Sequence, residues 1–410
     1  MRADVAVIGG GPAGATTAWA LACGGVDVLI LDRATFPRAK ACAEYVSPAA
    51  SRILDAMGAL ASVERAGAAQ LTGMRIRAPS GVTFEGHFAA AHGYHGFRDR
   101  GLALPRVEFD ALVLDRAIAS GARVRQGCHV IGVAHDVHGQ VSGVDAIDAV
   151  HGRVSVDARI VIGADGLRSI IARRLGLAHR ARTPRRVAFV AHFRGVLGMG
   201  DAGEMHVERD GYVGLANVGF GRTNVAVVVP APMARAAAGD AAGFLRRWIG
   251  GHPHLAERFA RATRVTSVLT TGPFASHARR AAAPGAALVG DAADFFDPFT
   301  GEGIYAAMRG GEMLAPHVIA SLRAPHPRAA ARALRDYDRA RRREFMGKWV
   351  VERLVGLAVG HAPVMNHVAR ALATRAGMAD LLVGVAGDFV PPAEVLRARY
   401  LFDLVRPVGR

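Results

Sequence analysis

Lysine is almost absent from this chain of 410 residues, although the chain is strongly basic. Only Lys40 and Lys348 are present, so arginine supplies nearly all of the 51 basic side chains that oppose 35 acidic ones. A formal net charge of +16 would suit a nucleic-acid partner, because clustered cations attract phosphate backbones. The arginines are scattered rather than gathered in blocks, which favours a solvated surface, and we therefore expect no nucleic-acid partner.

Cysteine is also scarce. The three cysteines, Cys23, Cys42 and Cys128, form no closely spaced pair, which argues against a disulfide framework and against a zinc site. A histidine-rich stretch at residues 87–95 lacks both a helical spacing and a partnering carboxylate. We therefore predict no metal site.

No part of the sequence has the pattern of a signal peptide or of a membrane span. A strand pattern begins at Asp4, and the apolar stretches near the C-terminus are interrupted by charges such as Glu352 and Arg353. We expect a cytoplasmic protein. Apolar residues alternate with arginine in residues 331–410, which fits either a helical cap on the core or contact with a membrane surface. A monomer and a homodimer both stay open.

The order of the expected elements predicts an α/β (or α+β) protein with interleaved domains. Residues 4–32 read as strand, glycine turn, helix and strand, which is a βαβ unit. Helices are expected at residues 47–64, 106–120 and 304–314, and short strands at 153–156 and 160–162. The expected segments are 1–71, 101–180 and 276–330 for a Rossmann-like nucleotide-binding domain, 72–100 and 181–275 for an inserted mixed β-sheet substrate domain, and 331–410 for C-terminal helices.

The segment from Gly9 to Gly14 reads GGGPAG and has the GxGxxG spacing, directly after one strand and at the start of a helix. Glycine is needed there for a tight turn, for a close approach of the backbone to a pyrophosphate, and for packing of the helix on the strand. The helix N-terminus offers free N–H groups to the phosphates. Asp32 ends the next strand and can bind a ribose hydroxyl. The residues predicted to bind a dinucleotide are Gly9, Gly11, Pro12, Ala13, Gly14 and Asp32.

The GxGxxG spacing alone does not distinguish NAD from FAD, and two later segments help to separate them. Residues 163–169 read GADGLRS after a strand, and residues 287–303 read ALVGDAADFFDPFTGEG after another. With the three segments in this order, the chain resembles flavoprotein hydroxylases of the para-hydroxybenzoate hydroxylase fold and the related geranylgeranyl reductases over nearly its whole length. The resemblance implies a Rossmann-like FAD-binding domain, FAD as the cofactor and NAD(P)H as the electron donor.

The resemblance also implies roles for individual residues. Asp165, Gly166 and Arg168 would lie near the pyrophosphate and contribute to the use of NAD(P)H, although a turn capped by Asp165 is an alternative. Asp291 would bind the ribityl chain, and the helix after it would direct its N-terminus at the flavin. The other residues that we assign to FAD are Arg33, Lys40, Ala41, Arg106, Val130, Gly290, Pro298, Gly301, Glu302, Gly303 and Ile304.

The residues around Cys42 match the reductases with one departure. Residues 36–44 read FPRAKACAE, which is similar to the PRxKxCGE stretch of that branch, with Ala43 in place of glycine. Two roles stay open for Cys42: a small side chain buried in the core, or a thiol that lines the pocket. The reductases' Tyr-x-Trp-x-Phe-Pro motif would fall at residues 211–217, where Tyr212 is kept and the other positions have changed. Cys42, Tyr212 and Pro298 are our pocket candidates, and no catalytic side chain is assigned.

Because most positions of the reductases' Tyr-x-Trp-x-Phe-Pro motif have changed at residues 211–217, the substrate pocket differs from theirs. This difference favours an NAD(P)H-dependent monooxygenase that hydroxylates an apolar aromatic or polyketide-like metabolite through a flavin C4a-hydroperoxide. The alternatives are a geranylgeranyl-reductase-like enzyme that saturates isoprenoid double bonds, as residues 298–305 (PFTGEGIY) favour, an electron-transfer flavin dehydrogenase, and a non-enzymatic FAD-binding module. The tryptophans are isolated, which disfavours halogenation, and the lack of a GxSxG elbow leaves a hydrolase without support.

Overall fold

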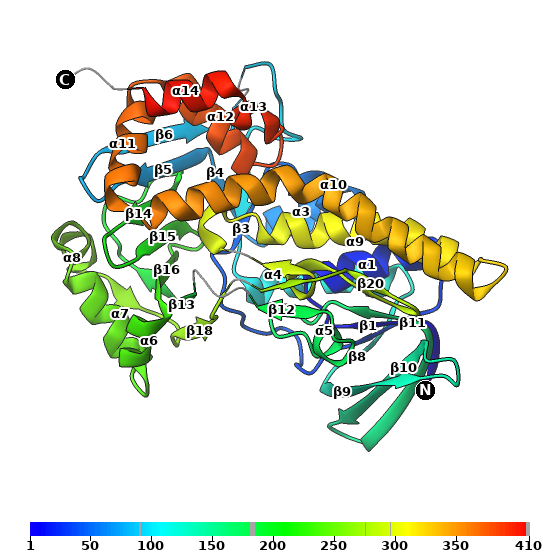
Figure 1. Ribbon diagram of the computed structural model, residues 1–410. Coiled ribbons are helices and arrows are strands. Elements are labelled where there is room, and N and C mark those ends of the chain that lie inside the picture. The colour runs from blue at the N-terminus through cyan, green and yellow to red at the C-terminus, as the bar shows by residue number, and fades with distance from the viewer. Residues whose placement is uncertain (90–91, 181–184, 275, 296, 407–410) are drawn as a thin grey trace.

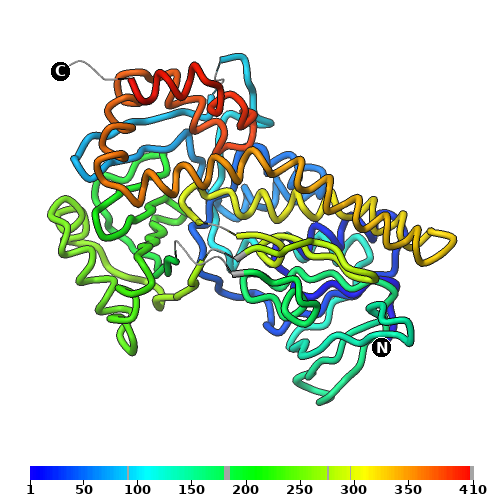
Figure 2. The backbone as a smooth tube through the Cα atoms, viewed as in Figure 1, coloured from blue at the N-terminus to red at the C-terminus, as the bar shows by residue number. Residues whose placement is uncertain are grey.

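The computed structural model describes residues 1–89, 92–180, 185–274, 276–295 and 297–406. Two large sheets lie side by side, a group of C-terminal helices lies over the second, and one long helix extends from this group toward the first (Figure 1). The chain passes between the two sheets several times, as the colours of the backbone tube show (Figure 2). The two sheets therefore correspond to interleaved rather than consecutive parts of the sequence.

The first sheet is built around β1 (Arg2–Ile8), whose residues Val5 to Ile8 are buried. Burial of a continuous apolar run is typical of a parallel strand that is covered on both faces. Helix α1 (Pro12–Cys23) packs against both α4 (Arg106–Ala119) and α9 (Gly303–Leu322). The strand order is β20 (Ala282–Ala283), β21 (Ala286–Leu288), β11 (Gly152–Gly163), β1, β2 (Val28–Leu31) and β8 (Arg123–Arg125), with the antiparallel strands β10 (Val141–Asp148) and β9 (Cys128–His135) added beside β11.

The second sheet separates two apolar cores. Val225 and Val227 of one strand pack with Trp248 on one face, whereas the alternate residues Ala226 and Val228 face the C-terminal helices. This is the two-residue period of a strand that is buried on both sides. The strand order is β17 (Thr263–Arg264), β13 (Arg186–Arg194), β16 (Thr223–Pro230), β15 (Tyr212–Asn217), β14 (Gly203–Val207), β5 (Gly73–Arg77) and β6 (Thr83–His87), with β18 (Leu269–Thr271) beside β13.

Shorter elements connect the two sheets. Two small sheets each have three strands in the described residues: β12 (Ala178–Arg180), β19 (Ser276–Ala278) and β22 (Asp294–Phe295) form one, and β3 (Tyr45–Val46), β7 (Gly101–Ala103) and β4 (Ala69–Leu71) form the other. The short helices are α2 (Ala50–Ala56), α3 (Leu60–Arg65), α5 (Ile170–Arg174), α6 (Ala231–Ala234), α7 (Ala241–Gly250) and α8 (Pro253–Phe259), with the 3-10 turns η1 (Arg235–Ala237), η2 (Gly290–Ala292) and η3 (Pro298–Thr300).

Helix α10 (Pro327–Val359) is the longest helix of the described chain and runs from the first sheet toward the second (Figure 1). It packs along α9, and the helices that follow it cover the second sheet, with α12 against β6. These helices are α11 (Ala362–Ala373), α12 (Ala376–Ala386), α13 (Ala393–Leu396) and α14 (Ala398–Val405). Among the described residues, no helix is both long enough and apolar enough to cross a membrane.

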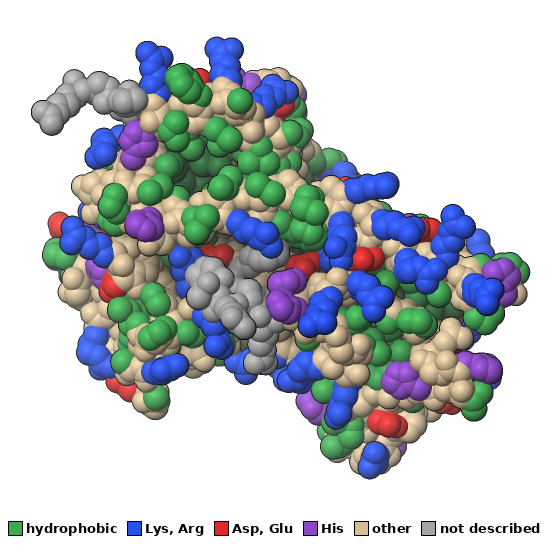
Figure 3. All heavy atoms as spheres, viewed as in Figure 1, with side chains coloured by type: hydrophobic (Ala, Val, Ile, Leu, Met, Phe, Trp, Pro, Cys, Tyr) green, Lys and Arg blue, Asp and Glu red, His purple; other side chains and the backbone are tan. Residues whose placement is uncertain are grey.

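Several large apolar side chains are exposed on the C-terminal helices. Leu354 and Leu357 of α10, Val364 of α11, and Phe402 and Val405 of α14 each expose more than a third of their surface. Hydrophobic side chains gather over this end of the molecule, with arginines at its edge (Figure 3). Such a surface fits the membrane contact considered above, which stays a prediction.

The structure confirms the α/β fold class and changes three expected elements. The helix expected at 47–64 is two helices, α2 and α3, because Gly58 between them has a left-handed backbone (φ +69°). The two strands expected at 153–156 and 160–162 are the single strand β11, in which exposed Asp157 and Arg159 alternate with buried Ala158. The helix expected at 304–314 continues to Leu322. The proposed domain division stays a prediction, and residues 181 and 275 at its boundaries lie outside the described residues.

A buried acid stabilises the second sheet at β14. Glu204 accepts a hydrogen bond from His206 Nε2 (2.8 Å) and forms an ion pair with Arg258 of α8. Burial alone would raise the pKa of Glu204, but the hydrogen bonds from His206 and Arg258 outweigh it and lower this pKa to about 2. The carboxylate therefore stays charged down to strongly acidic pH.

Glu204→Gln is expected to make the stability of the protein less dependent on acid. Because the pKa of Glu204 is lower in the folded protein, its charge stabilises the fold at pH values above the ordinary pKa near 4.5, and this stabilisation is lost as the pH falls toward 2. The loss in unfolding free energy for this shift is roughly 3 kcal/mol. Denaturant unfolding measured between pH 7 and pH 2 should show that loss in the parent protein and not in the variant. Glu257→Gln, at an exposed position on α8, is the control. A parent and a variant with parallel pH profiles would contradict this assignment.

Candidate active site

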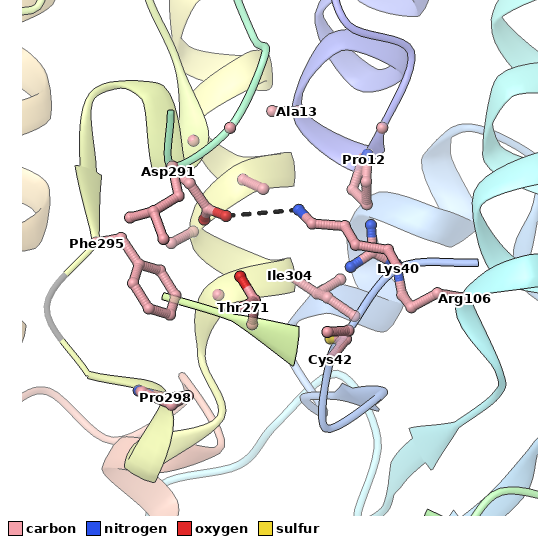
Figure 4. Close-up of a pocket in the computed structure, with 18 of the residues that line it drawn as sticks. Pro12, Ala13, Lys40, Cys42, Arg106, Thr271, Asp291, Phe295, Pro298 and Ile304 are labelled. Carbon is pink, nitrogen blue, oxygen red and sulfur yellow. Dashed lines mark ion pairs between the residues drawn. The ribbon is translucent and has the colours of Figure 1, made fainter. Parts of the chain in front are cut away.

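A cavity of about 820 Å³ is lined by residues of both sheets, α9 and α10. Apart from Gly14, every site residue predicted from the sequence lines this cavity, and several of them are drawn in Figure 4. These residues are Gly9, Gly11, Pro12, Ala13, Asp32, Arg33, Lys40, Ala41, Cys42, Arg106, Val130, Asp165, Gly166, Tyr212, Gly290, Asp291, Pro298, Gly301, Glu302, Gly303 and Ile304. Segments that are far apart in the sequence thus meet at one place.

Two glycines at the turn between β1 and α1, Gly9 and Gly14, have no room for a side chain. Gly9 has a φ of +105°, and a Cβ atom at Gly9 would lie 2.5 Å from the carbonyl oxygen of Ala164. A Cβ atom at Gly14 would lie 1.8 Å from the carbonyl oxygen of Gly9. Gly14 therefore allows the helix to pack on the strand, whereas Gly9 and Gly11 present bare backbone to the cavity, as the three glycine positions of this fingerprint require.

Asp32 supports the same turn. Its carboxylate accepts hydrogen bonds from the backbone N–H of Gly10 (2.7 Å) and from that of Ala34 (2.8 Å). A carboxylate offers about four lone-pair sites, so these two bonds leave capacity for a ribose hydroxyl from the cavity. The predicted ribose contact is thus compatible with a structural role that the sequence pattern alone did not indicate.

The loop that contains Lys40 and Cys42 crosses the cavity. Lys40 Nζ lies 3.5 Å from Asp291 Oδ2, and the two side chains extend toward each other from different segments (Figure 4). The loop is attached to the second sheet, because Asn224 Nδ2 donates to the carbonyl oxygen of Cys42 (2.9 Å) and His192 Nε2 lies 2.7 Å from Glu44 Oε2. The backbone N–H of Glu44 also approaches Cys42 Sγ at 3.3 Å. The thiol therefore lines the cavity on an anchored loop.

Arg106 begins α4 at the edge of the cavity, next to the glycine turn. Its guanidinium forms two hydrogen bonds with Asp110 (2.5 and 2.7 Å) and is almost completely buried. Asp110 also pairs with Arg38 Nη1 at 3.2 Å. Two cations that share one buried carboxylate leave a net positive charge beside Gly11, which suits a pyrophosphate.

Asp165 accepts a hydrogen bond from the start of α5, whose N-cap residue is Ser169, and still has an unused oxygen. Its Oδ2 accepts a hydrogen bond from the backbone N–H of Ile170 (2.6 Å), so the alternative of a capped turn is present in the structure. Its Oδ1 is buried and has no hydrogen-bond partner among the described residues. Burial raises the pKa of Asp165 against the opposing effect of its hydrogen bonds. A buried carboxylate oxygen without a donor points to a hydroxyl-bearing ligand, because such atoms are nearly always paired.

The third segment brings a helix N-terminus to the cavity. Asp291 lies in η2, three residues after the end of β21. Gly301 has a left-handed backbone (φ +74°) with Tyr45 2.9 Å from where a Cβ atom would be. Helix α9 then begins at Gly303, with Glu302 before it and Ile304 after it on the cavity wall. The free N–H groups of this long helix favour a negative charge in front of them.

Tyr212 lines the cavity from β15 but does not present a free hydroxyl. Its O–H donates to Asp297 Oδ1 (2.6 Å), and Asp297 pairs with Arg186 Nη1 (2.6 Å). Burial and then Asp297 raise the pKa of Tyr212 well above 10, so the phenol stays neutral. Phe299 contacts its ring edge to face, with the ring centroids 5.1 Å apart. Tyr212 is therefore a wall residue.

Helix α10 supplies residues that the sequence reasoning missed. Arg341, Phe345, Trp349 and Glu352 line the cavity. Their spacing of four, four and three residues places them on one face of a helix, and this spacing was the signal that could have found them. The sequence pattern of residues 331–410 predicts only a helical cap or a membrane-contacting region. Arg341 is engaged by Asp294 and lies over the ring of Trp349.

A smaller apolar cavity of about 90 Å³ adjoins the large one. Met205, Thr300 and Glu302 line both cavities, and the rest of the smaller cavity is formed by apolar side chains of the second sheet and of α10, α11 and α12. In the part of the chain that the structure describes, no group of three or more His, Cys, Asp or Glu side chains is arranged to hold a metal ion.

The residues present fit FAD. Gly9 and Gly14 have no space for a side chain, the adjacent arginines leave a positive charge, and Asp165 Oδ1 and Asp291 are acceptors beside them. The N-termini of α1 and α9 both open on the same cavity. The glycine turn and the arginines would hold the pyrophosphate of FAD, and the carboxylates would accept hydrogen bonds from its hydroxyl groups.

Comparison with known proteins gives concordant results. A family model described as the FAD binding domain matches residues 2–352. Digeranylgeranylglycerophospholipid reductase 2 of Methanopyrus kandleri is 34% identical over 317 residues, which cover 75% of this chain and 74% of that reductase. The menaquinone reductase of Mycolicibacterium smegmatis is 32% identical over 332 residues, which cover 77% and 76% of the two chains.

A solved structure also resembles this chain. The myxobacterial chondrochloren halogenase, described as a variant of the FAD-dependent halogenases, superposes with a TM-score of 0.78 at 26% identity. The match covers 85% of this chain and 80% of the halogenase. The reductases and the halogenase thus share one architecture with this chain, while their names denote different reactions.

Proposed function

This chain belongs to the FAD-binding domain family and is an FAD-dependent oxidoreductase, and from that premise we propose that it saturates double bonds of an isoprenoid-bearing lipid or quinone. Reductases with names of this kind match three quarters of its length at more than 30% identity. The monooxygenase reaction that the rebuilt pocket motif favoured becomes the second candidate. NAD(P)H is the proposed electron donor in both cases.

The observation that carries this proposal is the meeting of two reductase-like segments across the cavity. Lys40 and Cys42 come from one segment, and Pro298 and Ile304 from the other, and all four surround the same space (Figure 4). Beyond them the wall is apolar, with Ala188, Val190, Met205, Ala226 and Val228 from the second sheet. An apolar wall of this kind suits an isoprenoid chain.

When bound, FAD supplies the two-electron chemistry, and the chain positions the reactants. The N-terminus of α9 favours negative charge at the ring end of the cavity. Asp291, held by Lys40, offers an acceptor for hydroxyl groups. The apolar wall and the covering helix α10 exclude water, which strengthens these electrostatic interactions. Tyr212 forms part of the wall and keeps its proton in the hydrogen bond that it donates to Asp297.

The monooxygenase is favoured by a specific difference in β15. Residues 211–217 keep Tyr212 but lack the tryptophan and the Phe-Pro pair of the reductase motif. Gly214 lies in this stretch on the cavity wall, and Met205 Sδ would lie 3.2 Å from a Cβ atom at this position. The wall is therefore formed here by a flexible methionine instead of a tryptophan, which suits a substrate of a different shape from an isoprenoid chain.

A mass measurement of the product separates the two candidates. We expect the FAD-loaded protein to oxidise NADPH or NADH without oxygen when a geranylgeranyl lipid or menaquinone is present, and the product to gain two hydrogen atoms for each reduced double bond. A fully saturated phytanyl lipid is the control and should give no turnover. A product that gains an oxygen atom, formed only in air, would replace this proposal with the monooxygenase.

A further inference from the structure

Glu352 places a carboxyl group in the wall of the large cavity. It is partly buried, and it lies one helical turn after Lys348 and on the cavity-lining face of α10 with Phe345 and Trp349. No cation of the described chain lies within ion-pair distance of its carboxyl group. The acids around it differ in this respect, because each of them contacts a lysine or an arginine.

The charges around Glu352 do not balance. Asp297 pairs with Arg186 (2.6 Å) and Asp294 with Arg341, whereas Lys348 alone serves two carboxylates, Glu302 (3.5 Å) and Asp388. Five carboxyl groups therefore share three cations: Glu302, Asp388, Asp297, Asp294 and Glu352 against Lys348, Arg186 and Arg341. The other titratable groups nearby are Glu344, which pairs with Arg309, the neighbouring Arg353, and the phenols of Tyr212 and Tyr305.

An excess of buried negative charge is relieved when a carboxyl group takes up a proton. Glu352 is the member of the cluster without an ion-pair partner, so it is the group that takes the proton. Burial, followed by the charge of Glu302, raises the pKa of Glu352 well above its ordinary value, against the opposing charge of Lys348. The cavity wall therefore includes a carboxyl group that gives up its proton less readily than an ordinary glutamate.

We propose that Glu352 is the catalytic residue that protonates the substrate carbon during double-bond saturation. The inference rests on the proposed reductase function. Saturation adds a hydride, supplied by reduced flavin, to one carbon and a proton to the other. The O–H bond of Glu352 breaks, a C–H bond forms, and the carboxylate that remains regains a proton from water. The surplus of carboxylates stabilises the positive charge that develops on the carbon.

The protonation state of Glu352 can be measured without turnover. The infrared spectrum of the FAD-loaded protein at neutral pH should contain the C=O stretch of a protonated carboxyl group. Glu352→Gln should remove that band, and Glu257→Gln, at an exposed position of α8, should retain it. Identical spectra for the parent and Glu352→Gln would show that Glu352 is ionised and would overturn the proposal.

Turnover tests the role itself. Glu352→Gln should keep bound FAD and its reduction by NADPH, while formation of saturated product falls about 100-fold, as for loss of a general acid. Glu352→Asp should recover part of that rate, because it restores a carboxyl group. Unchanged product formation by Glu352→Gln would overturn the proposal. If the parent protein forms no saturated product, the reductase function fails, and the infrared band still decides whether Glu352 holds a proton.

Discussion

Gly14→Ala is expected to abolish FAD binding and to reduce the yield of folded protein. The added Cβ would lie 1.8 Å from the carbonyl oxygen of Gly9 and 3.2 Å from Ala164 Cβ. The nearer atom belongs to the backbone, so no side-chain rotation relieves the overlap, and α1 must move away from β1. We expect a loss of unfolding free energy on the order of 4 kcal/mol, the upper end of single substitutions. Flavin absorbance of the purified protein and thermal unfolding measure both effects.

Gly10→Ala is the matched control for this experiment. A Cβ at Gly10 would lie 3.4 Å from Leu114 Cδ1 and 3.5 Å from Asp32 Oδ2, which is ordinary van der Waals contact. The variant should therefore fold and retain the yellow cofactor. Full flavin occupancy in Gly14→Ala would contradict the tight packing between α1 and β1 on which the site depends.

Asp291→Ala is expected to leave the purified protein colourless. Asp291 lines the cavity from η2 and pairs with Lys40, so its removal takes away a carboxylate acceptor and leaves Lys40 without this partner. Hydrogen bonds to a charged group contribute about 1.5–3 kcal/mol, which corresponds to roughly a 10- to 100-fold weaker FAD affinity. Titration of the apoprotein with FAD, followed by flavin fluorescence, gives the dissociation constants.

The effect of this substitution should be limited to the cofactor. Asp336→Ala on α10 removes another carboxylate from an ion pair with a basic residue, Arg339, at an exposed position, and it should bind FAD like the parent protein. Asp291→Ala should unfold at nearly the temperature of the parent apoprotein. If Asp291→Ala keeps full flavin occupancy, the assignment of this residue is wrong.

The residues on the cofactor side of the site could be predicted from the sequence because each is required by the conformation of a short stretch of backbone. Glycine is required at positions 9, 14 and 301 by backbone angles or by close contacts, and such glycines form short motifs that can be recognised in the sequence. Asp32 and Asp291 each follow a buried strand, so their place at the end of the sheet could also be inferred. The fold class followed from the same alternation of strands and helices.

The substrate side was not predictable in the same way. Trp349 and Glu352 line the cavity only because α10 crosses from one sheet toward the other, and no local pattern encodes that crossing. The tyrosine of β15 was found by resemblance, but its hydrogen bond to Asp297 joins residues that are 85 positions apart. The exposed Asp157 and Arg159 made one long strand resemble two, because charged residues are more typical of turns.

The two lysines have a practical consequence for work with this protein. Lys40 lines the cofactor cavity with 40% of its side chain exposed, and Lys348 is buried among carboxylates. Acylating reagents, amine-coupled sensor surfaces and lysine-directed cross-linkers will therefore react at the N-terminal amine and at the cofactor cavity. Immobilisation through amines would interfere with cofactor binding, whereas the extent of labelling at Lys40 can itself serve as a measure of cofactor occupancy.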